Sequence, residues 1–211
     1  LALKRFLQLN KNGLIVGLDA DTIVEENYLN SIYTHFKKHN NTAVSIHFEH
    51  PISGGYADDH YQLICSYELH LRYYKNALSF VGFPFDFYTI GSAFALTASA
   101  YARQGGMNRR KAGEDFYFIN KLIKGEDFGE INNTKVIPSS RISDRVPFGT
   151  GRAMLEAKNN KKDLSYTYSF NAFLELKKWI DLIKKNELGY DAFPKSVQAF
   201  LNEKIYISCF F

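Results

Sequence analysis

Apolar and polar positions along the chain follow a pattern that predicts strands interspersed with helices. Apolar runs of strand length lie at residues 14–18, 42–48, 89–97 and 136–137. Apolar residues recur at helical spacing within residues 3–7, 25–38, 60–78 and 114–122. Together these segments predict an α/β fold.

Residues 14–18 are the most informative of these segments. The run is continuously apolar, as expected of a strand that is buried on both faces in a parallel sheet covered by helices. Asp19 and Asp21 follow it directly. In open α/β sheets, ligands bind beyond the carboxyl ends of the strands, so these two acids lie where chemistry is expected.

The pattern changes near residue 159. Residues 159–163 form a polar linker, and helical patterns follow at 170–183 and after Pro194. We therefore expect a first domain at residues 1–158 and a helical extension at residues 159–211. The extension is expected to pack on the core, with a partner protein or a membrane surface as alternatives. The chain starts at Leu1 inside an expected helix, which favours an N-terminally truncated fragment.

Composition narrows the classes of function. With 26 Lys and Arg against 22 Asp and Glu, the net charge is +4, which favours phosphorylated substrates or an anionic membrane surface. It is too small and dispersed for nucleic acid, and Arg109-Arg110-Lys111 is expected to be a solvated loop. No apolar run reaches the roughly 20 residues that span a bilayer, and no signal peptide is visible. Cys65 and Cys209 lack metal-ligand spacing, which fits a reducing, cytosolic compartment.

The segment Asp19-Ala20-Asp21 is a candidate metal site. Two carboxylates one residue apart at the end of a buried strand are unfavourable unless a cation neutralises them. Mg²⁺ or Mn²⁺ binds through one or two carboxylates and bridges to substrate phosphates, where it can neutralise a leaving diphosphate. The alternative is a solvated acidic turn that caps a helix. We favour the metal site.

A second candidate site combines Gly105-Gly106-Met107 with Glu114-Asp115. Paired glycines allow close approach of a substrate to the backbone, or an unusual turn. A carboxylate placed at a cleft can act as a base that removes the proton of a substrate hydroxyl. Asp115 is expected to be this base, with Glu114 orienting it or sharing the site. Alternatively, both acids only stabilise the start of a helix.

Residues 139–152 interleave three arginines, Arg141, Arg145 and Arg152, with hydroxyl residues and glycines. Guanidinium groups suit phosphate oxygens, and a flexible loop could close over a diphosphate. A surface loop held by Arg–Asp pairs is an equal alternative. The segment Asp58-Asp59-His60 is a weaker candidate for a second metal site, because a helix cap explains it more simply.

The order of these features resembles the family 2 glycosyltransferases of the GT-A fold. The matching segments are Gly17-Leu18-Asp19-Ala20-Asp21-Thr22, Gly91-Ser92-Ala93-Phe94-Ala95-Leu96, Gly105-Gly106-Met107 and Gly113-Glu114-Asp115-Phe116. The resemblance covers residues 1–152, and it depends on the order and spacing of loose motifs. It implies a Rossmann-like mixed sheet flanked by helices, a DxD element at Asp19 and Asp21, and Asp115 as the base of an inverting transfer.

The resemblance also implies a hexosyltransferase that uses a nucleotide-diphosphate sugar and a saccharide or lipid-linked acceptor in surface polysaccharide synthesis. Such an enzyme would act in the cytoplasm or at the inner face of the membrane. Two departures stand out. The strands that bind the nucleotide base in this family would precede Leu14, and the Arg-rich loop stands where many members have a His ligand or a Gln/Arg-Trp element.

Three other classes of protein share parts of this pattern. A phosphatase of the haloacid dehalogenase type is disfavoured, because Thr22 directly follows Asp21 instead of standing two positions after it. A nucleotidyltransferase with a similar sheet stays open. So does an incomplete or non-catalytic GT-A-like module that acts in protein interaction.

Overall fold

A computed structural model describes residues 2–108, 113–145, 147 and 149–185. The chain forms two compact units, which we describe separately. Among the described residues, the first comprises residues 2–68 and 87–164, and the second comprises residues 69–86 and 165–185. Helix α3 (Asp58–Val81) runs through both. The expected boundary at residues 158/159 stays a prediction.

The first unit contains a mixed sheet in the order β1-β4-β3-β5-β2. Its strands are β1 (Leu14–Gly17), β2 (Ile23–Val24), β3 (Ala43–Phe48), β4 (Phe94–Thr97) and β5 (Phe128–Ile137). Only the β3–β5 pair is parallel among these described strands. Its register shifts after Ile46, where β5 carries extra residues before Lys135 pairs with His47. The predicted α/β class is confirmed.

The prediction that residues 14–18 form an interior strand of a parallel sheet is wrong. Strand β1 pairs antiparallel with β4, lies at one edge of the described sheet, and is half-buried throughout. Leu18 lies beyond the strand and is exposed. An apolar run indicates that its side chains are buried. Whether the strand pairs parallel or antiparallel depends on which distant strand lies beside it.

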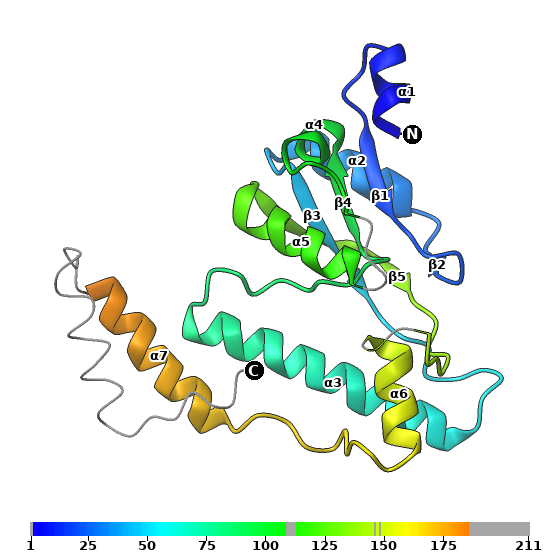
Figure 1. The fold of residues 1–211 in the computed structure, drawn as a ribbon, viewed down its shortest axis with the longest axis vertical. Helices are drawn as coiled ribbons and strands as arrows, with labels where there is room; N and C mark the ends of the chain where they lie inside the picture. Colours follow the sequence, from blue (N-terminus) through cyan, green and yellow to red (C-terminus); the bar gives the residue numbers. More distant parts are fainter. Residues whose placement is uncertain (1, 109–112, 146, 148, 186–211) are drawn as a thin grey trace. The chain divides into compact units, whose positions relative to one another are not determined.

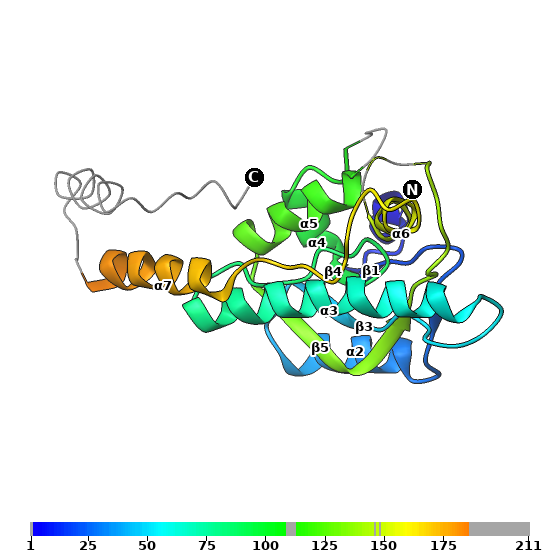
Figure 2. The same ribbon diagram turned by 90° about the horizontal axis from the view of Figure 1, so that it is seen from below.

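Helices cover both faces of this sheet. The helices of the first unit, besides the start of α3, are α1 (Ala2–Gln8), α2 (Tyr28–Lys38), α4 (Ala98–Arg103), α5 (Glu114–Gly125) and α6 (Thr150–Lys158). Figure 2 shows α4 and α5 on one face and α2 on the other. Phe94 and Leu96 of β4 are buried against Phe118, Ile119 and Leu122 of α5. Burial of each such side chain contributes about 1.5–3 kcal/mol, so this cluster fixes α5 on the sheet.

Three described elements of the first unit were not predicted, namely β2, α4 and α6. Strand β2 has two residues and exists because it pairs with β5. Helix α4 is rich in alanine and too short to show periodicity, although Thr97 caps it by accepting a hydrogen bond from the amide of Ala100 at 3.1 Å. Strand β4 is shorter than the expected segment 89–97, and β5 is longer than the expected segment 136–137.

The second unit pairs the later half of α3 with α7 (Phe170–Lys185), and the two helices lie side by side (Figures 1 and 2). Their shared core contains Ala77 and Val81 from α3 and Phe173 and Ile180 from α7. This confirms the helix predicted at residues 170–183, while the segment after Pro194 lies outside the described residues. None of the described helices is long and apolar enough to cross a membrane.

Candidate active site

Three carboxylates and two arginines gather in the first unit. Asp19 and Asp21 lie between β1 and β2, Asp115 lies in the first turn of α5, and Arg141 and Arg145 follow β5. Desolvation raises the pKa of Asp19, and the charges of Asp21 and Asp115 raise it further, while Arg145 and Arg141 oppose the shift. The structure therefore brings these five predicted residues into one electrostatic neighbourhood.

Pairing of β2 with β5 explains how Arg141 reaches the acids. Ile23 lies opposite Ile137 in an antiparallel register, so the chain before Ile23 and the chain after Ile137 leave the same end of the pair. Nε of Arg141 lies 2.7 Å from Oδ2 of Asp21. The side chains are 53% and 40% exposed, and solvent-exposed pairs contribute about 0–1 kcal/mol, so this pair can open readily.

Close backbone packing fixes Asp115 relative to β1. Oδ1 of Asp115 accepts a hydrogen bond from the amide of Phe116 at 2.7 Å. Its Oδ2 lies only 2.0 Å from the position that a Cβ at Gly91 would occupy. A Cβ at Gly17, the last residue of β1, would in turn lie 2.7 Å from the Gly91 carbonyl oxygen. This contact of Asp115 with Gly91 was not predicted, although the Gly-Ser pair before a strand was its signal in the sequence.

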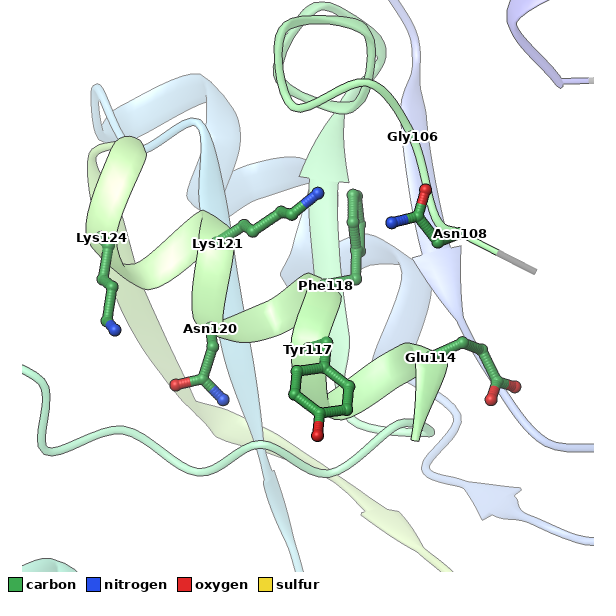
Figure 3. A pocket seen from close by; sticks show the side chains of 8 residues that line it. All are labelled: Gly106, Asn108, Glu114, Tyr117, Phe118, Asn120, Lys121 and Lys124. Atoms are coloured by element: carbon green, nitrogen blue, oxygen red, sulfur yellow. The ribbon is translucent and has the colours of Figure 1, made fainter. Parts of the chain in front are cut away.

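Glu114 lines a cavity of about 250 Å³ on the outer side of α5 (Figure 3). The other lining residues are Gly106, Asn108, Tyr117, Phe118, Asn120, Lys121 and Lys124. Figure 3 shows the side chains of Lys121 and Asn108 directed toward Phe118 from its two sides. The cavity therefore joins Glu114 with Gly106, two of the residues that were expected to contact substrate or support catalysis.

The Gly105-Gly106-Met107 turn ends α4. Both glycines have left-handed backbone angles, with φ of 72° and 73°, and their amides bond to the carbonyl oxygens of Ala102 and Tyr101. Met107 donates its amide to the Tyr101 hydroxyl at 3.2 Å and packs against the core cluster. The end of a helix thus accounts for the paired glycines. Contact of this turn with substrate stays a prediction.

Arg152 lies apart from the loop that carries Arg141 and Arg145. It belongs to α6, and its Nε bonds Oε1 of Glu156 at 2.7 Å, four residues later in the helix. Asp58 and Asp59 lie within the first turn of α3, and Asp59 accepts a hydrogen bond from the amide of the adjacent His60, so the expected cap by an acid before the helix stays a prediction. Residues 109–112, including Arg109-Arg110-Lys111, lie outside the described part of the chain.

The donor set suits an oxygen-preferring divalent cation. Asp19 is desolvated and repelled by two acids, so a cation would relieve an unfavourable concentration of negative charge. Within the described residues, no group of three or more His, Cys, Asp and Glu side chains could hold a metal ion. Mg²⁺ and Mn²⁺ sites commonly use only one or two carboxylates and take further oxygens from substrate phosphates and water. Asp19 and Asp21 fit this pattern.

Comparison with known families decides the class of the protein. A sequence profile described as glycosyl transferase family group 2 matches residues 14–185. The chain belongs to this family. The matched segment of this glycosyl transferase contains every site residue predicted above, and the mixed sheet flanked by helices is consistent with the predicted GT-A-like fold. No curated protein and no solved structure matches the chain.

Proposed function

We propose that this glycosyl transferase moves a sugar from a nucleotide-diphosphate sugar to an acceptor hydroxyl, with inversion at the anomeric carbon and with the help of Mg²⁺ or Mn²⁺. The observation that carries the proposal is the proximity of Asp115 to Asp19 and Asp21, which the Gly17–Gly91–Asp115 packing holds in place. Asp115 is assigned to the acceptor side, and the other two acids to the donor side.

On the donor side, Asp19 and Asp21 would hold the cation, which supplies positive charge to the diphosphate. Arg141 and Arg145 lie beside these acids and can bind phosphate oxygens through their guanidinium groups. Arg152, in the first turn of α6, is assigned to the same phosphate-binding group, where it would exchange its contact with Glu156 for a phosphate oxygen. Binding therefore requires Arg141 to exchange its contact with Asp21 for one with phosphate.

On the acceptor side, Oδ2 of Asp115 accepts the proton of the attacking hydroxyl, because Oδ1 is engaged by the amide of Phe116. The hydroxyl oxygen forms a bond to the anomeric carbon while the bond from this carbon to the diphosphate oxygen breaks. A single displacement of this kind inverts the anomeric centre. Glu114 and the Gly105-Gly106-Met107 turn are assigned to positioning of the acceptor.

The cellular location and the acceptor are proposed from the family and the charge of the chain. We place the reaction in the cytoplasm or at the inner face of a membrane, with a saccharide or a lipid-linked acceptor, in the synthesis of a surface polysaccharide. Family membership and the net charge of +4, which suits phosphorylated substrates and anionic lipid surfaces, support this assignment. Peripheral contact with a membrane is compatible with it.

Thermal unfolding with Mn²⁺ and a nucleoside diphosphate tests the donor site. Stabilisation should require both ligands and should vanish in Asp21→Ala. Asp58→Asn is a matched control, because Asp58 is an acid in the first turn of α3 that lies outside the proposed site. A chain that responds to neither ligand would instead fit the alternative of a non-catalytic interaction module.

Asp115→Asn tests the base. Transfer should fall by about 10²–10⁴-fold, because the amide cannot accept the proton, while affinity for the nucleotide diphosphate stays near the wild-type value. Steady-state transfer and equilibrium nucleotide binding measure the two effects separately. An equal loss of nucleotide affinity would show that Asp115 has a donor-binding role instead.

A further inference from the structure

A second cavity, of about 310 Å³, lies where the start of α3 meets the loop after β5 and the end of α6. Its lining residues are Tyr56, Ala57, Asp59, His60, Leu63, Arg141, Ile142 and Lys158. All belong to the first unit. Of these residues, the proposed transfer uses only Arg141. The cavity therefore adjoins the donor site through one side chain but has no function of its own so far.

One wall of the cavity is an aromatic stack. The ring of Tyr56 lies 4.1 Å from the ring of His60, at an interplanar angle of 23°, and Tyr56 is 50% exposed. His60 is buried, and its Nε2 lies 3.0 Å from Oγ of Ser140, which is buried as well. The bond to Ser140 holds His60 behind Tyr56. The exposed Tyr56 ring is thus a supported flat surface with a polar edge, which suits the apolar face of a sugar ring.

The floor of the cavity is apolar and well packed. Leu63 and Ile142 pack against a buried cluster of Tyr61, Ile64 and Met154, which joins α3 to α6. Such packing holds the lining residues in one arrangement, as a specific binding site requires.

The charged groups around the cavity select the kind of saccharide. Arg141 and Lys158 supply two positive charges against the one negative charge of Asp59, whose Oδ1 accepts a hydrogen bond from the amide of His60. Hydrogen bonds from cationic side chains to anionic oxygens are stronger than those between neutral groups. A sugar that carries a carboxylate or phosphate group therefore fits these walls better than a neutral sugar.

We propose that this cavity binds a negatively charged saccharide unit of the acceptor, with its ring on Tyr56 and its acidic group at Lys158. The assignment to the acceptor rests on the proposed transferase function. Arg141 connects the cavity to Asp21, so the bound unit lies beside the donor site. Carboxylate and phosphate share this chemistry, and the experiment below separates them.

Isothermal titration of the full chain with methyl glucoside, glucuronic acid and glucose 6-phosphate tests the proposal. At least one charged sugar should bind about tenfold more tightly than methyl glucoside, and the tighter of the two identifies the acidic group. Tyr56→Ala should weaken binding of that sugar at least about tenfold, whereas Tyr56→Phe, which keeps the ring, should stay within about threefold. Lys158→Met should lower the affinity for the charged sugar to nearly that for methyl glucoside.

Equal binding of neutral and charged sugars, or charged-sugar binding that Tyr56→Ala leaves unchanged, would overturn the proposal. A cooperative thermal unfolding transition of Tyr56→Ala would show that this variant is folded. The response of its melting temperature to Mn²⁺ with a nucleoside diphosphate separates the two hypotheses. Tyr56-dependent sugar binding without any nucleotide response removes the donor-site proposal but keeps the cavity, and the reverse result removes only the cavity.

Discussion

Nε of Arg141 lies 2.7 Å from Oδ2 of Asp21, so the guanidinium group contacts the carboxylate that we assign to a divalent cation. A cation bound at this oxygen would compete with Arg141, because their positive charges repel. We therefore expect cation binding to displace Arg141, which then becomes available to a phosphate group. The ion pair makes cation binding and the position of the loop after β5 dependent on each other.

Replacement of Arg141 should change the affinities for Mn²⁺ and for the nucleoside diphosphate in opposite directions. Arg141→Gln should raise the affinity for Mn²⁺ alone by about 2–5-fold, because a competing exposed ion pair is lost. The same variant should bind the nucleoside diphosphate more weakly. Electron paramagnetic resonance of free Mn²⁺ measures the first effect. Arg152→Gln is the control, since its guanidinium pairs with Glu156, and it should leave Mn²⁺ affinity unchanged. Weaker Mn²⁺ binding by Arg141→Gln would rule out the competition.

Gly91 should tolerate no side chain without loss of transfer. In Gly91→Ala the new Cβ would overlap Oδ2 of Asp115, so the carboxylate must rotate away from its present position. We expect kcat to fall by about 100-fold or more, since small displacements of a catalytic group cost this much. The melting temperature should fall as well, because the new Cβ would also lie 2.9 Å from Cγ and 3.0 Å from Cβ of Asp115, and rotation of the carboxylate does not move Cβ.

Gly55→Ala is the matched control for Gly91→Ala. A Cβ at Gly55 would meet no atom within 4 Å, and the backbone there is not left-handed. This variant should keep both kcat and melting temperature. Gly91→Ala with wild-type kcat would show that Asp115 does not need its present position.

Neutralising Asp19 should stabilise the fold near neutral pH. Its pKa in the folded chain is raised above 3.8, first by desolvation and then by Asp21 and Asp115. The favourable contribution of protonated Asp19 to the free energy of unfolding is therefore present below pH 3.8. It is lost as the pH rises through the pKa of Asp19 in the folded chain. Solvent screening keeps the effect small, so Asp19→Asn should melt about 1–2 °C higher at pH 7.

The pH dependence checks the cause of this stabilisation. Scanning calorimetry should show the difference between Asp19→Asn and wild type shrinking as the pH falls toward 3.8. Asp58→Asn should behave in the opposite way at pH 7, because it removes an acid that favours the start of α3. A melting temperature of Asp19→Asn below that of wild type at pH 7 would contradict the prediction.

Glu126 should stabilise the attachment of α5 in a pH-dependent manner. Its carboxylate is 3% exposed and accepts hydrogen bonds from Arg103, Gln104 and Thr42. The bond from Arg103 is the main cause that lowers its pKa to about 2. The contribution is fully present above pH 4.5 and is lost as the pH falls toward 2.

Glu126→Gln should therefore lower the free energy of unfolding by about 1–3 kcal/mol at pH 7, and by less at pH 3. Urea unfolding at both pH values measures this. Glu175→Gln is the control, because Glu175 pairs with the exposed Lys178 and its replacement should cost under about 0.5 kcal/mol. Equal losses in the two variants would contradict the assigned role of Glu126.

Much of the fold was predictable because burial leaves a periodic trace in the sequence. Phe118, Ile119 and Leu122 repeat at helical spacing, and all three are buried under β4 in the structure. The direction of β1 was not predictable in this way, because apolar residues do not encode which strand pairs with them. Helix α4 and strand β2 were not predicted for a related reason, since each is too short to show a periodic pattern of apolar residues.

The candidate site, like the fold, could be predicted only in part. The order of motifs predicted that Asp19, Asp21 and Asp115 serve one site, and the structure brings them together. The sequence could not predict that Arg141 pairs with Asp21 and that Arg152 pairs with Glu156. These partners depend on where the loop ends and α6 begins. The spacing of four between Arg152 and Glu156 was the available signal.

The pairing of α3 with α7 also bears on how the chain is made. Val81 emerges from the ribosome long before Phe173, its buried neighbour. At synthesis rates of roughly 5–20 residues per second, the apolar side of α3 waits about 5–20 s for its cover. Nascent chains that stop before α7 should consequently bind chaperones, and released chains that include it should not. Binding that is the same for both lengths would show that translation order has no such effect.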